Sequence, residues 1–318
     1  MKIVILDCTT IDHGDMDFSI FDSLGEVTVY QETLQESLLR HIGNAEVILC
    51  NKTHLPVEVL EQCPFLRYIG LFATGYNNIA TRRAAELGIT VCNAPDYSTD
   101  AVAQFAFALL LELVSRVGEY AESVRRGDWI GSGDFTYYLQ PMFELAGKTM
   151  GIIGFGSIGK RIAVLARAFK MEVLVYTRTP KASTEEGIHY VTLEELLRQS
   201  DAVSIHAPLT DQTRGLLNAE RIAWMKPTAY VINTARGPII DEAALADALK
   251  DGRLAGAGLD VLSREPMRAD NPLIGVENCI ITPHIAWKPT ETRRRLFEIV
   301  ADNLRAYQQG EPKNVVID

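Results

Sequence analysis

Short apolar runs alternate with runs of helical spacing along the first 97 residues. The apolar runs predict β-strands at residues 2–7, 26–30, 46–50, 68–73 and 90–93. The runs between them predict helices at residues 34–42, 56–62 and 80–87. This alternation is typical of a doubly wound parallel sheet, in which ligands bind beyond the carboxyl ends of the strands.

A second series of the same kind begins at Lys148. Its strands are predicted at residues 149–153, 171–176, 202–206, 229–233, 256–262 and 279–282. Thr192 and Glu195 have the spacing of a capping box, which predicts a helix start. Longer helices are predicted at residues 101–125 and 290–308. The fold class is therefore α/β, with two doubly wound, Rossmann-like parallel sheets.

Residues 131–146 are rich in aromatic side chains and show neither the helical nor the strand period of apolar positions. Such a segment either packs as an arm on its own domain or forms a surface that a second subunit covers. We favour the second interpretation.

The composition limits the classes of partner that the protein is expected to bind. The chain has 318 residues, of which 47% are hydrophobic, enough to fill two cores. Its formal charge of −10 argues against nucleic acid or an anionic membrane as the main partner. The apolar run at 101–114 is interrupted by Gln104 and Glu112, which favours a core helix over a membrane span.

The cysteines and the N-terminus indicate a cytoplasmic protein. The five cysteines are scattered and form no CxxC pair, so we expect free thiols in a reducing cytosol and no metal site. The N-terminal run becomes acidic at Asp7, too early for a signal peptide.

Three glycines, Gly154, Gly156 and Gly159, form a GxGxxG pattern between a predicted strand and a predicted helix. In a dinucleotide site the first glycine allows the tight turn, the second admits the pyrophosphate, and the third lets helix and strand pack closely. The helix N-terminus then faces the phosphates. The strand predicted at 171–176 completes the context for a dinucleotide site.

The position that usually holds the ribose-binding acid is occupied by Thr177, followed by Arg178. No carboxylate is present there to repel a 2′-phosphate, and the arginine is available to bind one. The alternative is a solvated loop arginine. We expect NAD(H) or NADP(H) as cofactor, with NADP(H) slightly favoured, or dual specificity.

Arg236, Glu265 and His284 each follow an apolar run of the second series. Singly, they are better explained as a salt-bridge partner, a solvated acid and a satisfied histidine. Together, at strand ends of a nucleotide-binding sheet, they are the groups that hydride transfer to a 2-oxo acid requires. A guanidinium holds the substrate carboxylate, an imidazolium donates the proton to the carbonyl oxygen, and a carboxylate fixes the imidazole.

The turn at 154–159, residues 234–237, Glu265-Pro266 and Pro283-His284 together resemble the D-2-hydroxyacid dehydrogenase family over essentially the whole chain. Residues 51–53, 73–77 and 284–287 look most like the glycerate dehydrogenases, also called hydroxypyruvate reductases. The resemblance implies that Arg236 binds substrate, Glu265 supports the histidine and His284 is the proton donor. It implies cofactor contacts from Gly154, Gly156, Ser157, Ile158, Gly159, Thr177, Arg178, His206, Ala207, Pro208, Thr213, Thr234, Ala235, Arg236, Asp260, His284 and Ala286.

The resemblance also implies a substrate site and a domain plan. The backbone amides of Thr74 and Gly75 would bind the substrate carboxylate with Lys52 nearby, alongside Arg236 and His284. Residues 1–98 and 288–318 would form a flavodoxin-like substrate domain, and residues 99–287 the dinucleotide-binding domain. Hinge closure between the two would expel water before transfer, and the protein would be a homodimer.

We therefore expect a cytoplasmic NAD(P)H-dependent reductase of hydroxypyruvate or glyoxylate that gives the D-2-hydroxy acid. A D-lactate-type or other 2-ketoacid reductase is an alternative decided by small differences in the pocket. Some 3-phosphoglycerate dehydrogenases also resemble the chain, but these often carry an added regulatory domain, which we do not expect here. From another class, a dinucleotide-sensing transcriptional corepressor has the same family fold.

Overall fold

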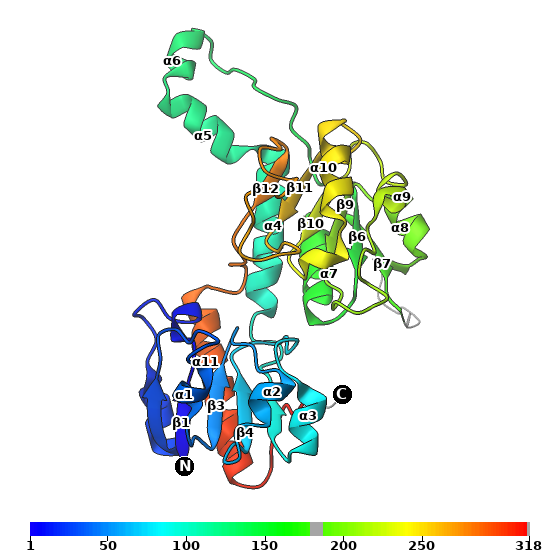
Figure 1. Ribbon diagram of the computed structural model, residues 1–318. Helices are drawn as coiled ribbons and strands as arrows, with labels where there is room; N and C mark the ends of the chain where they lie inside the picture. The colour runs from blue at the N-terminus through cyan, green and yellow to red at the C-terminus, as the bar shows by residue number, and fades with distance from the viewer. Residues whose placement is uncertain (179–186, 317–318) are drawn as a thin grey trace. The chain divides into compact units, whose positions relative to one another are not determined.

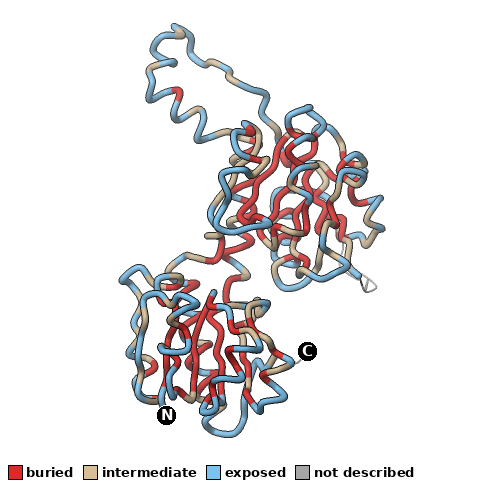
Figure 2. The backbone as a smooth tube through the Cα atoms, in the orientation of Figure 1, coloured by how far each residue is buried: buried red, intermediate tan, exposed pale blue. Residues whose placement is uncertain are grey.

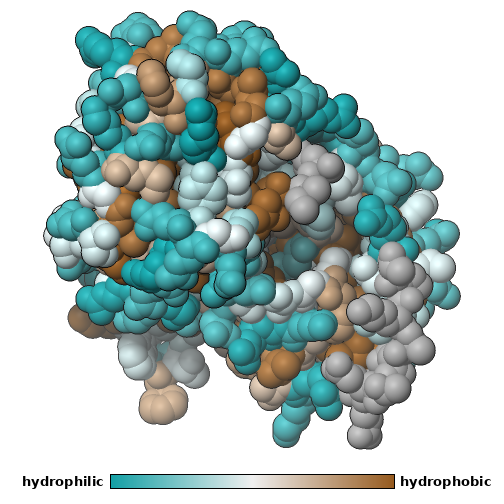
Figure 3. Space-filling view, turned by 90° about the horizontal axis from the view of Figure 1, so that it is seen from below, coloured by the Kyte–Doolittle hydropathy of each residue, from teal (hydrophilic) through white to brown (hydrophobic). Residues whose placement is uncertain are grey.

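The computed structural model describes residues 1–178 and 187–316. The chain folds into two compact units, one of Met1–Ser98 with Trp287–Asp318 and the other of Thr99–Ala286 (Figure 1). In each, the buried residues follow the strands and the inward faces of the helices (Figure 2). Polar side chains cover most of the surface seen in Figure 3.

The first unit contains a five-stranded parallel sheet in the order β2-β1-β3-β4-β5. The strands are β1 (Lys2–Ile5), β2 (Glu26–Val29), β3 (Val47–Cys50), β4 (Tyr68–Leu71) and β5 (Thr90–Cys92). All five were predicted, but except at β3 the predictions run one or two residues too far at the carboxyl ends. At β4 the apolar sequence continues while the backbone leaves the ladder, since Phe72 is buried beyond the end of the strand.

Helices cover both faces of this sheet. The elements are η1 (Cys8–Thr10), η2 (Phe18–Leu24), α1 (Leu38–Ile42), α2 (Val57–Leu60), α3 (Thr81–Glu86) and α11 (Thr290–Gln308). Side chains of α1, α2 and α3 share one apolar cluster with the strands. On the other face, Phe297 of α11 packs against Phe21 and Phe72. The last helix therefore completes the fold of the N-terminal unit, and its predicted bounds, 290–308, are confirmed.

The second unit contains a seven-stranded parallel sheet in the order β12-β11-β10-β9-β6-β7-β8. The strands are β6 (Thr149–Ile153), β7 (Glu172–Tyr176), β8 (Ile188–Tyr190), β9 (Ala202–Ile205), β10 (Tyr230–Asn233), β11 (Gly256–Leu259) and β12 (Cys279–Ile281). The short strand β8 was not predicted. Strand order reverses at β6, which lies between β9 and β7, so a ligand-binding crevice is expected at its carboxyl end. Two doubly wound parallel sheets were the predicted fold class, and this is confirmed.

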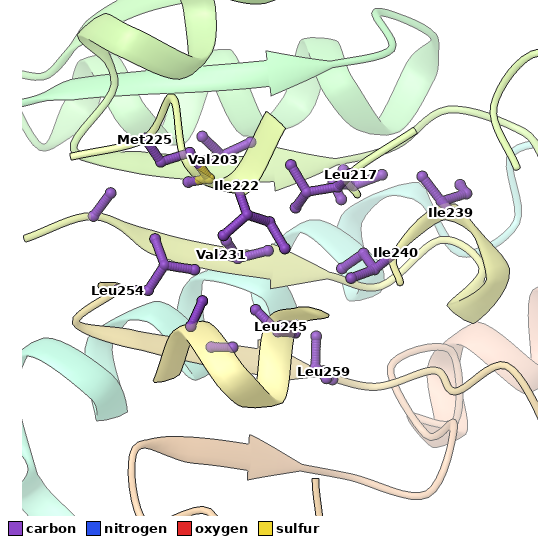
Figure 4. Close-up of a cluster of buried hydrophobic side chains, with 14 of the residues drawn as sticks. Val203, Leu217, Ile222, Met225, Val231, Ile239, Ile240, Leu245, Leu254 and Leu259 are labelled. Atoms are coloured by element: carbon purple, nitrogen blue, oxygen red, sulfur yellow. The ribbon is translucent and has the colours of Figure 1, made fainter. Parts of the chain in front are cut away.

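Two apolar clusters fix the layers of this unit. Helices α4 (Thr99–Ser115) and α7 (Ser157–Ala168) cover one face. The other face is covered by α8 (Leu193–Gln199), α9 (Ala219–Ile222) and α10 (Glu242–Lys250). Side chains of α9 and α10 pack against those of β9, β10 and β11 (Figure 4). The capping box that opens α8 is confirmed, since Thr192 Oγ1 accepts from the Glu195 amide at 3.2 Å.

The single helix predicted at 101–125 is wrong. It is two helices, α4 and α5 (Val117–Arg125), which meet at 57°. Arg116 between them has a left-handed φ of 50°, and the Glu112 carboxylate accepts the Gly118 amide at 3.0 Å. A carboxylate in the last turn of α4 thus starts the next helix. No single described helix is long and apolar enough to cross a membrane. Among the described helices, only α4 and α5 taken together have the length and composition of a span, and they are bent at the break between them.

Candidate active site

The three predicted catalytic residues follow three adjacent strands. Arg236 comes after β10, Glu265 after β11 and His284 after β12. These strands are parallel neighbours, so their carboxyl ends share one edge of the sheet.

Glu265 and His284 form a direct pair. His284 Nδ1 lies 2.7 Å from Glu265 Oε2. A carboxylate accepts only, so Nδ1 carries a proton in this contact, and any proton exchange with a substrate falls to the other ring nitrogen, Nε2. The imidazole side chain is 24% exposed, so a small molecule can reach it. His284 has a left-handed φ of 56°, a conformation that non-glycine residues adopt rarely and that recurs at functional sites.

The loop that carries Glu265 is held by hydrogen bonds from its own unit. The second oxygen of Glu265, Oε1, accepts from the Leu262 amide at 3.0 Å. Glu242, at the start of α10, accepts from the Ser263 amide and from Asn271 Nδ2. Sequence reasoning missed Glu242, because only the fold brings it to a loop 21 residues away.

The loop that carries His284 is held by Asp260. This buried carboxylate accepts from Thr282 Oγ1 at 2.7 Å, from the Ile285 amide at 2.9 Å and from the Ala286 amide at 2.8 Å. Burial raises the pKa of Asp260 above its usual value, against the lowering effect of these bonds. Asp260 was predicted as a cofactor contact, and in the structure both of its oxygens position the histidine loop.

The Arg236 loop packs on the Glu265 loop. A Cβ added to Gly237 would lie 1.9 Å from the Leu262 carbonyl carbon, so only glycine permits this approach. The buried amide of Asn233 donates to the Arg236 carbonyl at 3.0 Å and accepts from the Ala235 amide at 3.0 Å. Asn233, also missed by sequence reasoning, thus fixes the backbone of the half-buried arginine.

The glycine turn after β6 has the geometry of a dinucleotide cradle. Gly154 has φ 93°, and a Cβ there would lie 2.6 Å from the Ala207 amide nitrogen. A Cβ on Gly159 would lie 2.2 Å from the Gly154 oxygen. A Cβ on Gly156 would meet nothing within 4 Å, so the chain itself does not require glycine there. Open space at this position, above the uncapped N-terminus of α7, fits an approaching pyrophosphate.

A cavity of about 400 Å³ opens beside this turn. Its described lining includes eight predicted cofactor residues and six that were not predicted. The predicted ones are Gly154, Gly156, Thr177, Arg178, His206, Ala207, Pro208 and Thr213, and the others are Ile153, Phe155, Tyr176, Thr210, Gln212 and Leu216. Arg178 is the one charged side chain among these lining residues, since His206 is neutral.

The other predicted cofactor residues lie elsewhere in the same unit. Ser157, Ile158 and Gly159 form the first turn of α7. Thr234, Ala235, Arg236, Asp260, His284 and Ala286 lie after β10, β11 and β12.

His206 offers the cavity an unused polar atom. Desolvation of the ring lowers the pKa of His206 to about 3, so it is neutral. Its Nε2 lies 2.7 Å from Ser204 Oγ, whereas Nδ1 has no hydrogen-bond partner within the described residues. A buried polar atom without a partner is costly unless a ligand supplies one. The residues present therefore fit a dinucleotide cofactor.

The predicted substrate residues Lys52, Thr74 and Gly75 belong to the first unit. Thr74 is anchored because its hydroxyl donates to the Ala94 carbonyl at 2.8 Å and its carbonyl accepts from Asn93 Nδ2 at 2.7 Å. Over the described residues, the backbone amides of Thr74 and Gly75 have no acceptor in the chain. They are donors available to an anion.

Comparison with known proteins identifies the family. The model for the "D-isomer specific 2-hydroxyacid dehydrogenase, NAD binding domain" matches residues 107–286. The chain belongs to this family. As a member it is an oxidoreductase with a domain that binds a nicotinamide dinucleotide.

Relatives and solved structures match the chain over its whole length. It is 46% identical to the hydroxypyruvate reductase of Blautia hydrogenotrophica, over 99% of both chains. It is 39% identical to the glycerate dehydrogenase of Methylorubrum extorquens, over 99% of this chain and 98% of the relative. An acyclic imino acid reductase solved with NADPH and D-Arg superposes with a TM-score of 0.88 at 30% identity, covering 100% of both chains.

Proposed function

We propose that this dehydrogenase reduces a small 2-oxo acid, hydroxypyruvate or glyoxylate, to the D-2-hydroxy acid with NAD(P)H. The observation that carries the proposal is the 2.7 Å pair of Glu265 and His284 on the sheet that also bears the dinucleotide cradle. Similarity to a hydroxypyruvate reductase and a glycerate dehydrogenase supports the choice of substrate.

Each residue has one task in this reaction. Arg236 holds the substrate carboxylate with its planar guanidinium, and Lys52, Thr74 and Gly75 are proposed to bind the same group. His284 Nε2 gives its proton to the carbonyl oxygen as C2 is reduced, and in the reverse direction the neutral Nε2 takes that proton back. Glu265 keeps Nδ1 protonated throughout and fixes the ring. A bound nicotinamide dinucleotide supplies the hydride.

A panel of 2-oxo acids tested with NADH and with NADPH checks this proposal. We expect the highest kcat/KM for hydroxypyruvate or glyoxylate, ahead of pyruvate and of bulkier acids. Pyruvate in first place would establish the D-lactate-type alternative. Negligible turnover of every acid, with tight dinucleotide binding, would favour the corepressor-like sensor.

A cytosolic location stays a prediction from the scattered cysteines.

The cofactor preference follows from the end of β7. Thr177 and Arg178 line the cavity at this point, and its described lining contains no carboxylate. An arginine binds a 2′-phosphate, whereas the usual acid repels it. We therefore propose that NADPH is used at least as well as NADH.

Placing an acid at this position should reverse the preference. In Thr177→Asp, the ratio of kcat/KM for NADPH to that for NADH is expected to fall by about tenfold or more, because the carboxylate repels the 2′-phosphate. Steady-state kinetics with both cofactors measure the ratio. The matched variant Thr177→Val removes the hydroxyl without adding charge and should leave the ratio almost unchanged. An equal change in both variants contradicts an electrostatic cause.

We also propose a homodimer whose contact is the predicted segment, residues 131–146, together with the helices that precede it in the same arm, residues 117–146 in all. Figure 1 shows α5 and α6 (Asp128–Ser132) extending from the body of this unit, and Figure 2 shows them mostly exposed. The arm is ordered by its own bonds, since Ser123 Oγ donates to Asp128 at 2.6 Å and accepts from Tyr137 at 2.9 Å. Its apolar side chains nevertheless face outward, with Ile130 89% and Phe135 94% exposed. Apolar surface displayed in this way indicates an interface.

A charge on this surface should dissociate the dimer. We expect Phe135→Asp to shift the mass in solution toward the monomer, because the carboxylate would lose its hydration in the interface. Light scattering after size-exclusion chromatography, over a concentration series, measures the shift. Ile274→Asp, a similar change at a half-exposed site outside the arm, serves as control. Equal behaviour of the two variants would assign the interface to another surface.

A further inference from the structure

The turn that carries Lys52 is anchored by a buried carboxylate. Strands β1 and β3 are neighbours, so Asp7, just after β1, lies beside the turn Asn51-Lys52-Thr53 that follows β3. Asp7 is 5% exposed. Its Oδ1 accepts from the Asn51 amide at 2.9 Å, and its Oδ2 accepts from the amides of Lys52 at 2.6 Å and Thr53 at 2.8 Å.

The opposite side of the turn is held as well. Asn78 Nδ2 donates to the Thr53 carbonyl at 2.8 Å and to the Asn51 carbonyl at 3.3 Å. The Asn51 side chain donates to Thr10 Oγ1 at 3.0 Å. Side chains from two other segments therefore fix this turn, with Asp7 holding its amides and Asn78 its carbonyls.

This construction exceeds what a surface turn needs. Water normally satisfies the backbone groups of a loop at a strand end, and a buried carboxylate is costly unless several donors compensate it. Here three consecutive charge-assisted bonds fix the backbone dihedrals of three residues. Asn51 and Thr53 are buried, while Lys52 between them is exposed. The bonds therefore set the direction in which the Lys52 side chain leaves the backbone.

We propose that Asp7 is a positioning residue for substrate binding, which acts by holding Lys52 toward the carboxylate of the 2-oxo acid. The inference rests on the proposed function. Asn78 assists from the carbonyl side. Asp7 itself does not touch substrate, because its oxygens are occupied by the turn.

A double-mutant cycle tests this assignment. Asp7→Asn should raise the KM for hydroxypyruvate about tenfold while the Kd for NADPH changes less than twofold. If Asp7 acts through Lys52, the effect of Asp7→Asn should shrink to less than about twofold in a Lys52→Ala background, because residues that share one task are not additive. An undiminished effect in that background overturns the inference and makes Asp7 a general stabiliser of the unit.

The chain offers a matched control. Asp12 Oδ1 also accepts three backbone amides, from Gly14, Asp15 and Met16, each at 2.9 Å. Asp12→Asn should leave the KM for hydroxypyruvate unchanged. A rise equal to that of Asp7→Asn would show that loss of any capped turn in this unit is sufficient, which contradicts a specific role.

Two further results keep the outcome clear. If Asp7→Asn does not fold, Asn78→Ala releases the carbonyl side while the carboxylate stays in place, and an unchanged KM there refutes the inference. Wild-type protein that turns over no 2-oxo acid refutes the proposed function instead. Active wild-type protein with an unchanged KM in Asp7→Asn refutes only the positioning role.

Discussion

Turnover of hydroxypyruvate is expected to fall about 10²- to 10⁴-fold in His284→Ala, whereas NADPH should still bind. Alanine cannot give a proton to the carbonyl oxygen, so the developing alkoxide must take one from water. His284 does not line the cavity beside the glycine turn, so the loss should appear in kcat rather than in cofactor affinity. Steady-state kinetics and titration of NADPH fluorescence measure the two quantities separately.

Two variants sharpen this test. His189→Ala removes an exposed histidine from β8 of the same unit and should keep full activity. Glu265→Gln keeps a side chain that can accept from Nδ1 but removes the charge, and its kcat should lie between those of wild type and His284→Ala. Wild-type turnover in His284→Ala would remove His284 from the mechanism. A normal kcat in Glu265→Gln would mean that the 2.7 Å contact has no catalytic role.

The positions of the candidate catalytic residues were predictable because they depend on local sequence. Strands of a parallel sheet are buried on both faces and read as apolar runs, and the residue that follows such a run lies at the ligand-binding edge. Arg236, Glu265 and His284 all satisfy this simple condition. Gly154 and Gly159 were predictable for a related reason, since their spacing reflects contacts within one turn and one helix.

The residues that hold this site in place were not predictable in the same way. Asp7 binds amides 44 to 46 positions away in the chain, and Glu242 binds a loop 21 positions away. Nothing local distinguishes Glu242 from a solvated acid. Asp7 did carry a local signal, because it is an acidic residue at the end of the buried apolar run 3–6.

The break between α4 and α5 shows another limit. Apolar spacing continues past Ser115, and a period alone gives no reason to stop there. The helix ends because Arg116 has a left-handed φ and the Glu112 carboxylate accepts a hydrogen bond from the Gly118 amide. The Gly118 amide thus bonds to a side chain instead of to a helix carbonyl, and a hydrophobic pattern does not record this change. The break sets the direction in which the arm begins.

A second large loss is expected when Arg236 is replaced by alanine. We expect kcat/KM for hydroxypyruvate to fall about 10³-fold, equivalent to about 4 kcal/mol of transition-state stabilisation. The guanidinium is proposed to hold the substrate carboxylate with two parallel bonds, so its loss should raise KM and lower kcat together. Folding should survive, because Asn233 and the close approach of Gly237 to Leu262 still fix the backbone of this loop when the 2.7 Å bond from Arg236 Nη1 to the Ala235 carbonyl is lost.

Arg236→Lys separates charge from geometry. Lysine keeps the positive charge but cannot form the two-pronged pair, so it should recover only part of the loss. Arg253→Ala removes an exposed arginine of the same unit, whose described partner is Asp251, and should leave kcat/KM unchanged. If lysine restored full activity, a point charge would be sufficient and the planar fork would not matter. If Arg236→Ala altered only the affinity for NADPH, Arg236 would be a cofactor ligand, and recognition of the substrate carboxylate would rest on Lys52, Thr74 and Gly75.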